Sequence, residues 1–183
     1  MTSPDGITWT ARTSPEANDW REVVWSSELA LFVAVSLDGT NRVMTSPDGI
    51  TWTARSASSA RQWNSVEWAP GLGLLVAVAA DASAGNQIMT STDGITWNGT
   101  MTIDPKLGSY RRVRWSPELG VLVLVSSIYS GYSVTAYSDD GLSWYTATNE
   151  NDTDISFGLA WSPKLLQFCA VGNGPTNYTK TSL

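Results

Sequence analysis

One twelve-residue stretch recurs along the chain and constrains its fold more than any other feature. Residues 1–12 read MTSPDGITWTAR, and residues 44–55 repeat them letter for letter. Diverged copies follow at 89–97 (MTSTDGITW) and 136–144 (AYSDDGLSW), so successive copies start 43 to 47 residues apart. Such a period is typical of arrays in which one supersecondary unit buries its apolar faces by stacking on its neighbours. We therefore interpret the whole chain as a repeat protein.

The pattern inside each repeat predicts four short strands. The first strand alternates apolar residues in VVWS at 23–26, and recurs as VEWA at 66–69, VRWS at 113–116 and LAWS at 159–162. The second strand is apolar on both faces, so it must be covered on both sides; its copies are 29–35, 72–78, 119–125 and 165–171. A third strand then leads into Ser-x-Asp-Gly, a hairpin turn signal, and Ile-Thr-Trp-Thr starts the fourth.

Four antiparallel strands per unit, repeated at this period, predict an all-β fold, a β-propeller of four four-stranded blades in one domain over residues 1–183. The expected blades are residues 13–55, 56–101, 102–148, and 149–183 together with 1–12. The last unit has only three strands, whereas residues 7–12 form a fourth strand without a blade, so we expect the N-terminal strand to complete the last blade. The same pattern allows strand exchange between two chains in an eight-bladed ring, or a fragment of a larger propeller.

The recurring turn resembles the Asp-box of sialidase-like (BNR) repeat proteins. Residues 3–9, SPDGITW, and their copies at 46–52, 91–97 and 138–144 are similar to that family's Ser-x-Asp-x-Gly-x-Thr-Trp, with one residue fewer between Asp and Gly. The resemblance implies a propeller in which the box is a folding device on the face opposite the ligand site. It implies no single activity, because the box occurs in enzymes, receptors, assembly factors and phage tail proteins.

The residues of the box suit a structural role on physical grounds as well. The aspartates can accept backbone N–H bonds across the turn, and the tryptophans can pack between blades. Four carboxylates in a ring could suggest a metal site or a catalytic pair, but identical turn residues are more simply a repeated turn. We assign a structural role to Asp5, Asp48, Asp93, Asp140, Trp9, Trp52, Trp97 and Trp144.

Composition excludes several classes of function. Eleven basic against seventeen acidic residues give a net charge of −6, which disfavours nucleic acid and membrane surfaces as partners. The chain has no histidine, so Ser-His-Asp and Cys-His catalysis are excluded. Cys169 is the single cysteine, so no intrachain disulfide can form. We expect neither a cofactor nor a metal.

The remaining aromatic residues suggest a ligand site. Trp25, Trp68, Trp115 and Trp161 of the first strands are expected in the core with the box tryptophans. Trp20 and Trp63 lie five residues before the first-strand tryptophan, and this odd offset places them on the opposite face of a regular strand, near the loops that join the blades. These loops vary between repeats, as recognition loops do. The candidate site comprises Trp20, Trp63, Tyr110, Arg42, Arg61, Tyr129, Tyr132, Asn41, Asn86 and Asn177; alternatively, its aromatic residues only cover the loops.

Three hypotheses for function follow. The first is a non-enzymatic recognition module that binds a glycan or a protein surface, in an extracellular or virion setting, as a monomer or a strand-exchanged homodimer. The second is a purely structural component, such as a virion or tail part or an engineered repeat ring. The third is a fragment of a sialidase-like glycoside hydrolase, for which Glu22, Glu67 and Arg111 offer residue types but no matching motif. Arg111, Arg112 and Arg114 also form a small basic cluster, which strand alternation divides between two faces.

Overall fold

The computed structural model describes residues 1–81, 87–100, 109–127, 134–147, 155–173 and 179–181. In these ranges the chain forms strands and turns, and no described helix could span a membrane. Strands β1 to β4 form sheet 1 and β5 to β8 form sheet 2. Their bounds are β1 Trp20–Ser26, β2 Leu31–Ser36, β3 Val43–Ser46, β4 Thr53–Arg55, β5 Trp63–Ala69, β6 Leu74–Ala79, β7 Ile88–Ser91 and β8 Asn98–Thr100.

Two further sheets continue the series. Sheet 3 pairs β9 to β12 in the same order, and sheet 4 pairs β13, β14 and β15. The bounds are β9 Tyr110–Ser116, β10 Val121–Ser126, β11 Thr135–Ser138, β12 Tyr145–Thr146, β13 Ile155–Ser162, β14 Gln167–Asn173 and β15 Thr179–Thr181. All pairs are antiparallel, so the strands predicted from the repeat are found in the predicted order.

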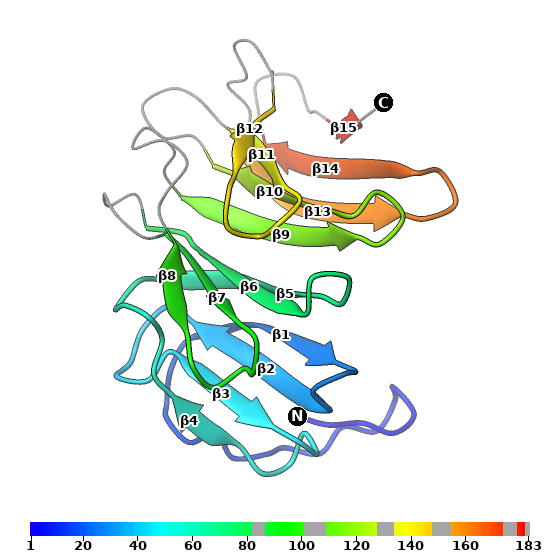
Figure 1. The fold of residues 1–183 in the computed structure, drawn as a ribbon. Coiled ribbons are helices and arrows are strands. Elements are labelled where there is room, and N and C mark those ends of the chain that lie inside the picture. Colours follow the sequence, from blue (N-terminus) through cyan, green and yellow to red (C-terminus); the bar gives the residue numbers. More distant parts are fainter. Residues whose placement is uncertain (82–86, 101–108, 128–133, 148–154, 174–178, 182–183) are drawn as a thin grey trace.

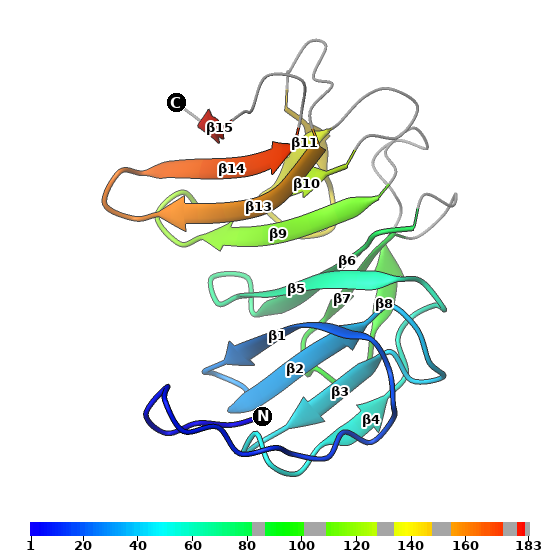
Figure 2. The ribbon, with the colours of Figure 1, turned by 180° about the vertical axis from the view of Figure 1, so that it is seen from behind.

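The four sheets stack face to face in chain order, from sheet 1 at one end to sheet 4 at the other (Figure 1). The first strand of each sheet contacts the first strand of the next, so β1, β5, β9 and β13 form one inner edge, which is clearest from behind (Figure 2). The arrangement is that of a propeller-like fold. The stack is open in the described residues, because its first and last sheets lie on opposite sides of the middle two.

Each sheet has two apolar faces, which we name by direction. The forward face, toward the next sheet, carries Val33 and Val35 in sheet 1; the backward face, toward the preceding sheet, carries Val66 and Trp68 in sheet 2. These residues pack together in one core cluster, and equivalent clusters join sheet 2 to sheet 3 and sheet 3 to sheet 4. Successive side chains of a strand point to opposite faces of its sheet, so a continuous apolar run has two apolar faces, and a neighbouring sheet must cover each of them.

The predicted closure by the N-terminal strand is not shown. Thr2 and Thr10 exchange two backbone hydrogen bonds, of 2.9 and 2.8 Å, and this hairpin lies beside sheet 1 rather than beside β15 (Figure 1). The hairpin repeats the Thr45–Thr53 pair of β3 and β4, and Arg12 bonds Thr2 as Arg55 bonds Thr45. Local pairing closes a much shorter loop than pairing with the far sheet, which lowers its entropic cost.

The four recurring turns have the same internal bonding. In the second copy, one carboxylate oxygen of Asp48 accepts the Ser46 hydroxyl and the N–H groups of Ile50 and Thr51 at 2.7 to 2.9 Å. These donors lower the pKa of Asp48 below its ordinary value. Gly49 holds φ +71°, and its carbonyl accepts the Trp52 indole N–H. The carboxylates of the box therefore stabilise the turns that contain them, through hydrogen bonds within each turn.

Candidate functional site

A β-bulge recurs at the start of every inner strand and decides where the candidate site residues point. The register shifts between Trp20 and Glu22, between Trp63 and Ser65, and between Ser156 and Gly158, and β9 has the same irregularity opposite Val125 and Ser126. One extra residue reverses the alternation of the strand. An offset of five across the bulge therefore returns to the same face instead of the opposite one.

The aromatic part of the predicted site is consequently wrong for two residues. Trp63 and Tyr110 are 0% exposed and belong to the same core clusters as Trp68 and Trp115. They cannot offer a face to a ligand. The Trp63 indole N–H donates to the Ser59 carbonyl at 3.1 Å, and that of Trp20 donates to the Glu16 carbonyl at 3.3 Å. These rings anchor the loops that enter the sheets.

The predicted polar residues hold loops together. Glu16 accepts both the backbone and the side-chain N–H of Asn41, at 3.1 and 2.6 Å, and these bonds lower the pKa of Glu16. Arg42 donates to the Arg61 carbonyl at 2.7 Å, and Arg61 pairs with Asp81 at 3.3 Å. Asn41, Arg42 and Arg61 therefore lie close together, and their bonds connect three neighbouring loops. Tyr129, Tyr132, Asn86 and Asn177 lie outside the described residues.

Two tryptophans expected in the core are exposed. Trp9 is 57% exposed in the N-terminal hairpin, and Trp25 is 43% exposed on the backward face of sheet 1. Their equivalents Trp97 and Trp68 are buried because a preceding sheet packs on them. No sheet of the described chain packs on the backward face of sheet 1, which explains the difference.

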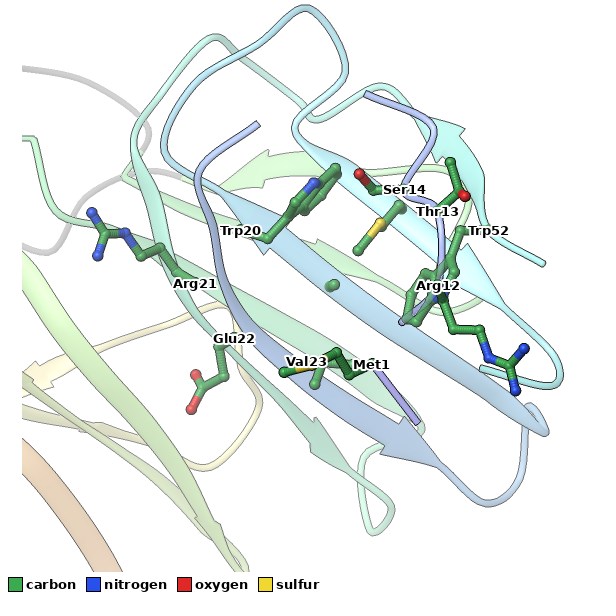
Figure 3. A pocket seen from close by; sticks show the side chains of 11 residues that line it. Met1, Arg12, Thr13, Ser14, Trp20, Arg21, Glu22, Val23 and Trp52 are labelled. Carbon is green, nitrogen blue, oxygen red and sulfur yellow. The ribbon is translucent and has the colours of Figure 1, made fainter. Parts of the chain in front are cut away.

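A pocket of about 390 Å³ lies on this backward face. Met1 and Thr13 of the N-terminal segment form one wall, and Trp20 and Trp52 form the other (Figure 3). Met44 also lines the pocket. The Arg21 and Glu22 side chains point away from it, toward the other sheets. The apolar lining residues hold the repeat positions that pack on a preceding sheet in sheets 2 and 3, so we interpret the pocket as an uncovered junction.

The residues at the bulges form a second, polar row along the inner edge. Arg21, Asn64, Arg111 and Phe157 share one repeat position. The Asn64 amide donates to the Arg111 carbonyl at 2.7 Å, and the Arg111 guanidinium lies 5.7 Å from the centre of the Phe157 ring. Successive bulges therefore place their side chains next to one another at the loop end of the stack.

Arg111 is the least satisfied member of this row. Its Nε is buried and has no hydrogen-bond partner in the described part of the chain. Burial lowers the pKa of Arg111, and the neighbouring charges of Arg112 and Arg21 lower it further. Arg21 pairs with Asp19 at 2.6 Å, whereas the ion pairs of the described residues include neither Arg111 nor Arg112. Among the described residues, this end of the inner edge is thus locally positive in a chain of net charge −6.

A charge cluster that spans three sheets lies next to this row. Glu22 of β1 accepts the Val66 N–H of β5 at 3.0 Å and the Arg114 guanidinium of β9 at 2.7 Å. Arg114 also reaches Glu67 of β5 at 3.4 Å. Burial raises the pKa of Glu67 to about 7; Arg114 opposes the rise, and Glu22 adds to it.

The bulge row is not apparent from the sequence, because alternation alone divides Arg111, Arg112 and Arg114 between faces. The one available signal was that Arg21, Asn64 and Arg111, two arginines and an asparagine, each follow an aromatic residue at one repeat position. This marked a place where the repeats differ in chemistry.

Comparisons with known proteins bear on the fold. No family model and no curated protein matches the sequence. A chain of the nidogen/laminin complex is similar in structure, with a TM-score of 0.63 and 14% identity, over 90% of this chain and 65% of that one. A luciferin-regenerating enzyme has a TM-score of 0.58 and 13% identity, over 90% of this chain and 60% of the enzyme.

A GH74 enzyme of Niastella koreensis is also similar, with a TM-score of 0.55 and 16% identity, over 84% of this chain and 22% of the enzyme. The chain therefore spans less than two thirds of each of these structures. At such low identity the likeness concerns the backbone fold. The chain is thus similar to part of several larger proteins, among which are a binding complex and enzymes, and its fold is all-β and propeller-like.

Proposed function

We propose that this protein is a non-enzymatic binding scaffold, whose inner edge at the loop end recognises an anionic group on a glycan or a protein surface. The observation that carries the proposal is the unpartnered, buried Nε of Arg111 beside Arg112 and Arg21. A guanidinium held in a fixed position forms short, charge-assisted hydrogen bonds with carboxylates and other oxyanions. Because Arg111 as a whole is only half-buried, a ligand oxyanion would approach its guanidinium from the solvent side, and no ion pair of the described residues engages that guanidinium.

The arrangement of the repeats supports a recognition role. The four recurring turns share the hydrogen bond from a backbone N–H to the carboxylate three residues earlier, which Asp5, Asp48, Asp93 and Asp140 accept. The loops at the other end of the strands differ in sequence, and contacts such as Glu16 with Asn41 and Arg42 with the Arg61 carbonyl fix them in place. A rigid scaffold with diverged loops at one end is typical of binding proteins.

The hydrolase hypothesis has weaker support. Glu67 and Glu22, with unequal environments, have the residue types of a glycosidase acid and base. Both, however, are bonded to one guanidinium, and Glu22 also accepts the Ser65 hydroxyl and the Val66 N–H. We therefore assign these carboxylates to the contact between sheets. A purely structural protein remains the second hypothesis, which the experiment below separates from a binding scaffold.

The test is a glycan array with neutral, carboxylated and sulfated members, together with a library of acidic and neutral peptides. We expect ligands with an anionic group, whose binding weakens as salt rises. Arg111→Gln should weaken the binding of the selected ligand at least tenfold. Arg55→Gln is the matched control, because Arg55 donates to Thr45 at a distance from the bulge row. Neutral ligands alone, equal losses in both variants, or no ligand at all would each contradict the proposal.

A further inference from the structure

We propose that two copies of this chain join head to tail, with the forward face of sheet 4 of one copy packed on the backward face of sheet 1 of the other. Two such junctions close a ring. The inference is independent of the proposed function, because it concerns the two faces at the ends of the stack.

The backward face of sheet 1 has the residues of a junction, but no sheet of the described residues packs on it. Val23 is 55% exposed, whereas its equivalents Val66 and Val113 are 1% and 0% exposed. Trp25 is 43% exposed, against 7% for Trp68. The pocket described above lies on this face, and its lining includes Val23, Met44 and Trp52. Contiguous apolar surface of this kind marks a contact with another protein surface.

The forward face of sheet 4 is exposed in a complementary way. Val171 of β14 is 49% exposed, whereas its equivalents Val35, Val78 and Val125 are at most 1% exposed. In each of the three internal junctions a forward face packs on a backward face, and forward faces do not meet one another. The repeat therefore specifies the partner of each free end: the other kind of face.

The turn of sheet 4 differs from these internal junctions at one charged position. The Trp68 indole donates to Glu28 at 2.6 Å, and the Trp161 indole donates to Glu118 at 2.6 Å. In both cases the turn between the first two strands of one sheet meets the first-strand tryptophan of the next. At the proposed junction, Lys164 holds the place of Glu28 and Glu118, opposite Trp25. An ammonium group can lie on an indole face and be attracted by it.

A second copy can dock without disturbing the internal junctions, although the N-terminal segment, whose Met1 and Thr13 line the pocket on the backward face of sheet 1, must then move off that face. Sheets 1 and 4 lie at opposite ends of the stack (Figures 1 and 2), so contact within one chain would require all three internal junctions to bend. Bending would strain the bonds from Glu22 to β5 and β9. The stack covers 65% of the nidogen/laminin chain and 60% of the luciferin-regenerating enzyme, so each of those chains continues beyond the part that this stack matches. Contacts between unlike faces close into rings when the rotation allows it.

Light scattering behind a sizing column tests the proposal directly. The wild type should have about twice the mass of one 19.8 kDa chain. Val23→Asp and Val171→Asp each block one kind of face and should both give monomers. An equimolar mixture of the two variants should form dimers again, because one forward and one backward face remain intact. Ile95→Asp is the control, since Ile95 is 47% exposed in a turn away from both faces and its substitution should leave the dimer unchanged.

A gain of affinity provides a second measurement that does not depend on a disrupted face. Lys164→Glu should give Trp25 the carboxylate acceptor that Trp68 and Trp161 have, and should lower the dimer dissociation constant about tenfold. A monomeric wild type would overturn the proposal. Loss of the dimer in Val23→Asp but not in Val171→Asp would indicate a symmetric contact and would overturn it too, as would open polymers whose length grows with concentration.

Discussion

Alanine substitution of the four turn glycines tests the packing of the sheets with a built-in control. Gly6, Gly49, Gly94 and Gly141 have φ between +71° and +75°, so alanine meets the same backbone strain at each, about 1 kcal/mol. The surroundings differ. A Cβ on Gly6 meets no atom of the described residues within 4 Å, and one on Gly49 lies 3.3 Å from the Thr2 methyl group.

The other two glycines lie in the junctions between sheets. A Cβ on Gly94 would lie 2.9 Å from a methyl of Leu31, and one on Gly141 would lie 2.6 Å from a methyl of Leu74, each in the preceding sheet. Overpacking costs about 1–3 kcal/mol, and the leucine ends can relieve part of it. We expect losses in the free energy of unfolding of about 1 kcal/mol or less for Gly6→Ala, 1–2 for Gly49→Ala, and 2–3 for Gly94→Ala and Gly141→Ala.

Urea unfolding followed by tryptophan fluorescence measures these differences at constant m-value. Equal losses for all four variants would refute the argument, because strain alone would then explain them. A loss at Gly6 as large as that at Gly141 would have a specific meaning. It would place residues 1–12 at the edge of sheet 4, where Gly6 would face sheet 3 as Gly141 faces sheet 2, as expected from the sequence.

Three further predictions concern single side chains. Glu67→Gln should increase the free energy of unfolding by up to roughly 3 kcal/mol above pH 7 and change it little below pH 4.5. The reason is that folding raises the pKa of Glu67 from 4.5 to about 7, so the wild type loses stability as the pH rises through this window. Urea titrations at pH 5 to 8 that run parallel for both proteins would contradict this. Trp63→Ala should cost about 3–5 kcal/mol and Trp9→Ala less than about 1 by thermal unfolding, because Trp63 is fully buried and Trp9 is 57% exposed; similar costs would show that the N-terminal hairpin is packed in solution. Glu28→Gln should blue-shift or quench Trp68 fluorescence at a cost of about 1 kcal/mol, since it removes the charged acceptor of the indole N–H; Glu118→Gln should act likewise through Trp161, and an unchanged spectrum in both would contradict the assigned bonds.

Much of the fold could be predicted because the same pattern of strands and turns recurs in each repeat of the sequence. Alternation in Val23 and Trp25 places the first strand, and the apolar run that contains Val33 and Val35 places a strand covered on both sides. Ser46, Asp48 and Gly49 specify a turn whose bonds are all local, so the sequence contains all the information needed.

The candidate site could not be predicted in the same way. A bulge adds one residue without changing composition, so the offset between Trp63 and Trp68 suggests opposite faces although both side chains lie in one cluster. The environment of Arg111 depends on Phe157 and Arg21, which come from other sheets. The exposure of Val23 and Val171 likewise depends on what lies beyond the ends of the stack, and strand patterns do not contain that information.

The identity of residues 1–12 and 44–55 has a consequence for the route by which this chain folds. Two identical segments can compete for one place beside β2, and no difference in side chains distinguishes them. Only the length of the connecting chain does: Met44 follows β2 after a short loop, whereas the first copy must reach back across β1. Loop-closure entropy therefore selects the second copy. Refolding should include a slow population in which residues 1–12 are paired with β2, and they must dissociate before β3 can pair there and form its hairpin with β4.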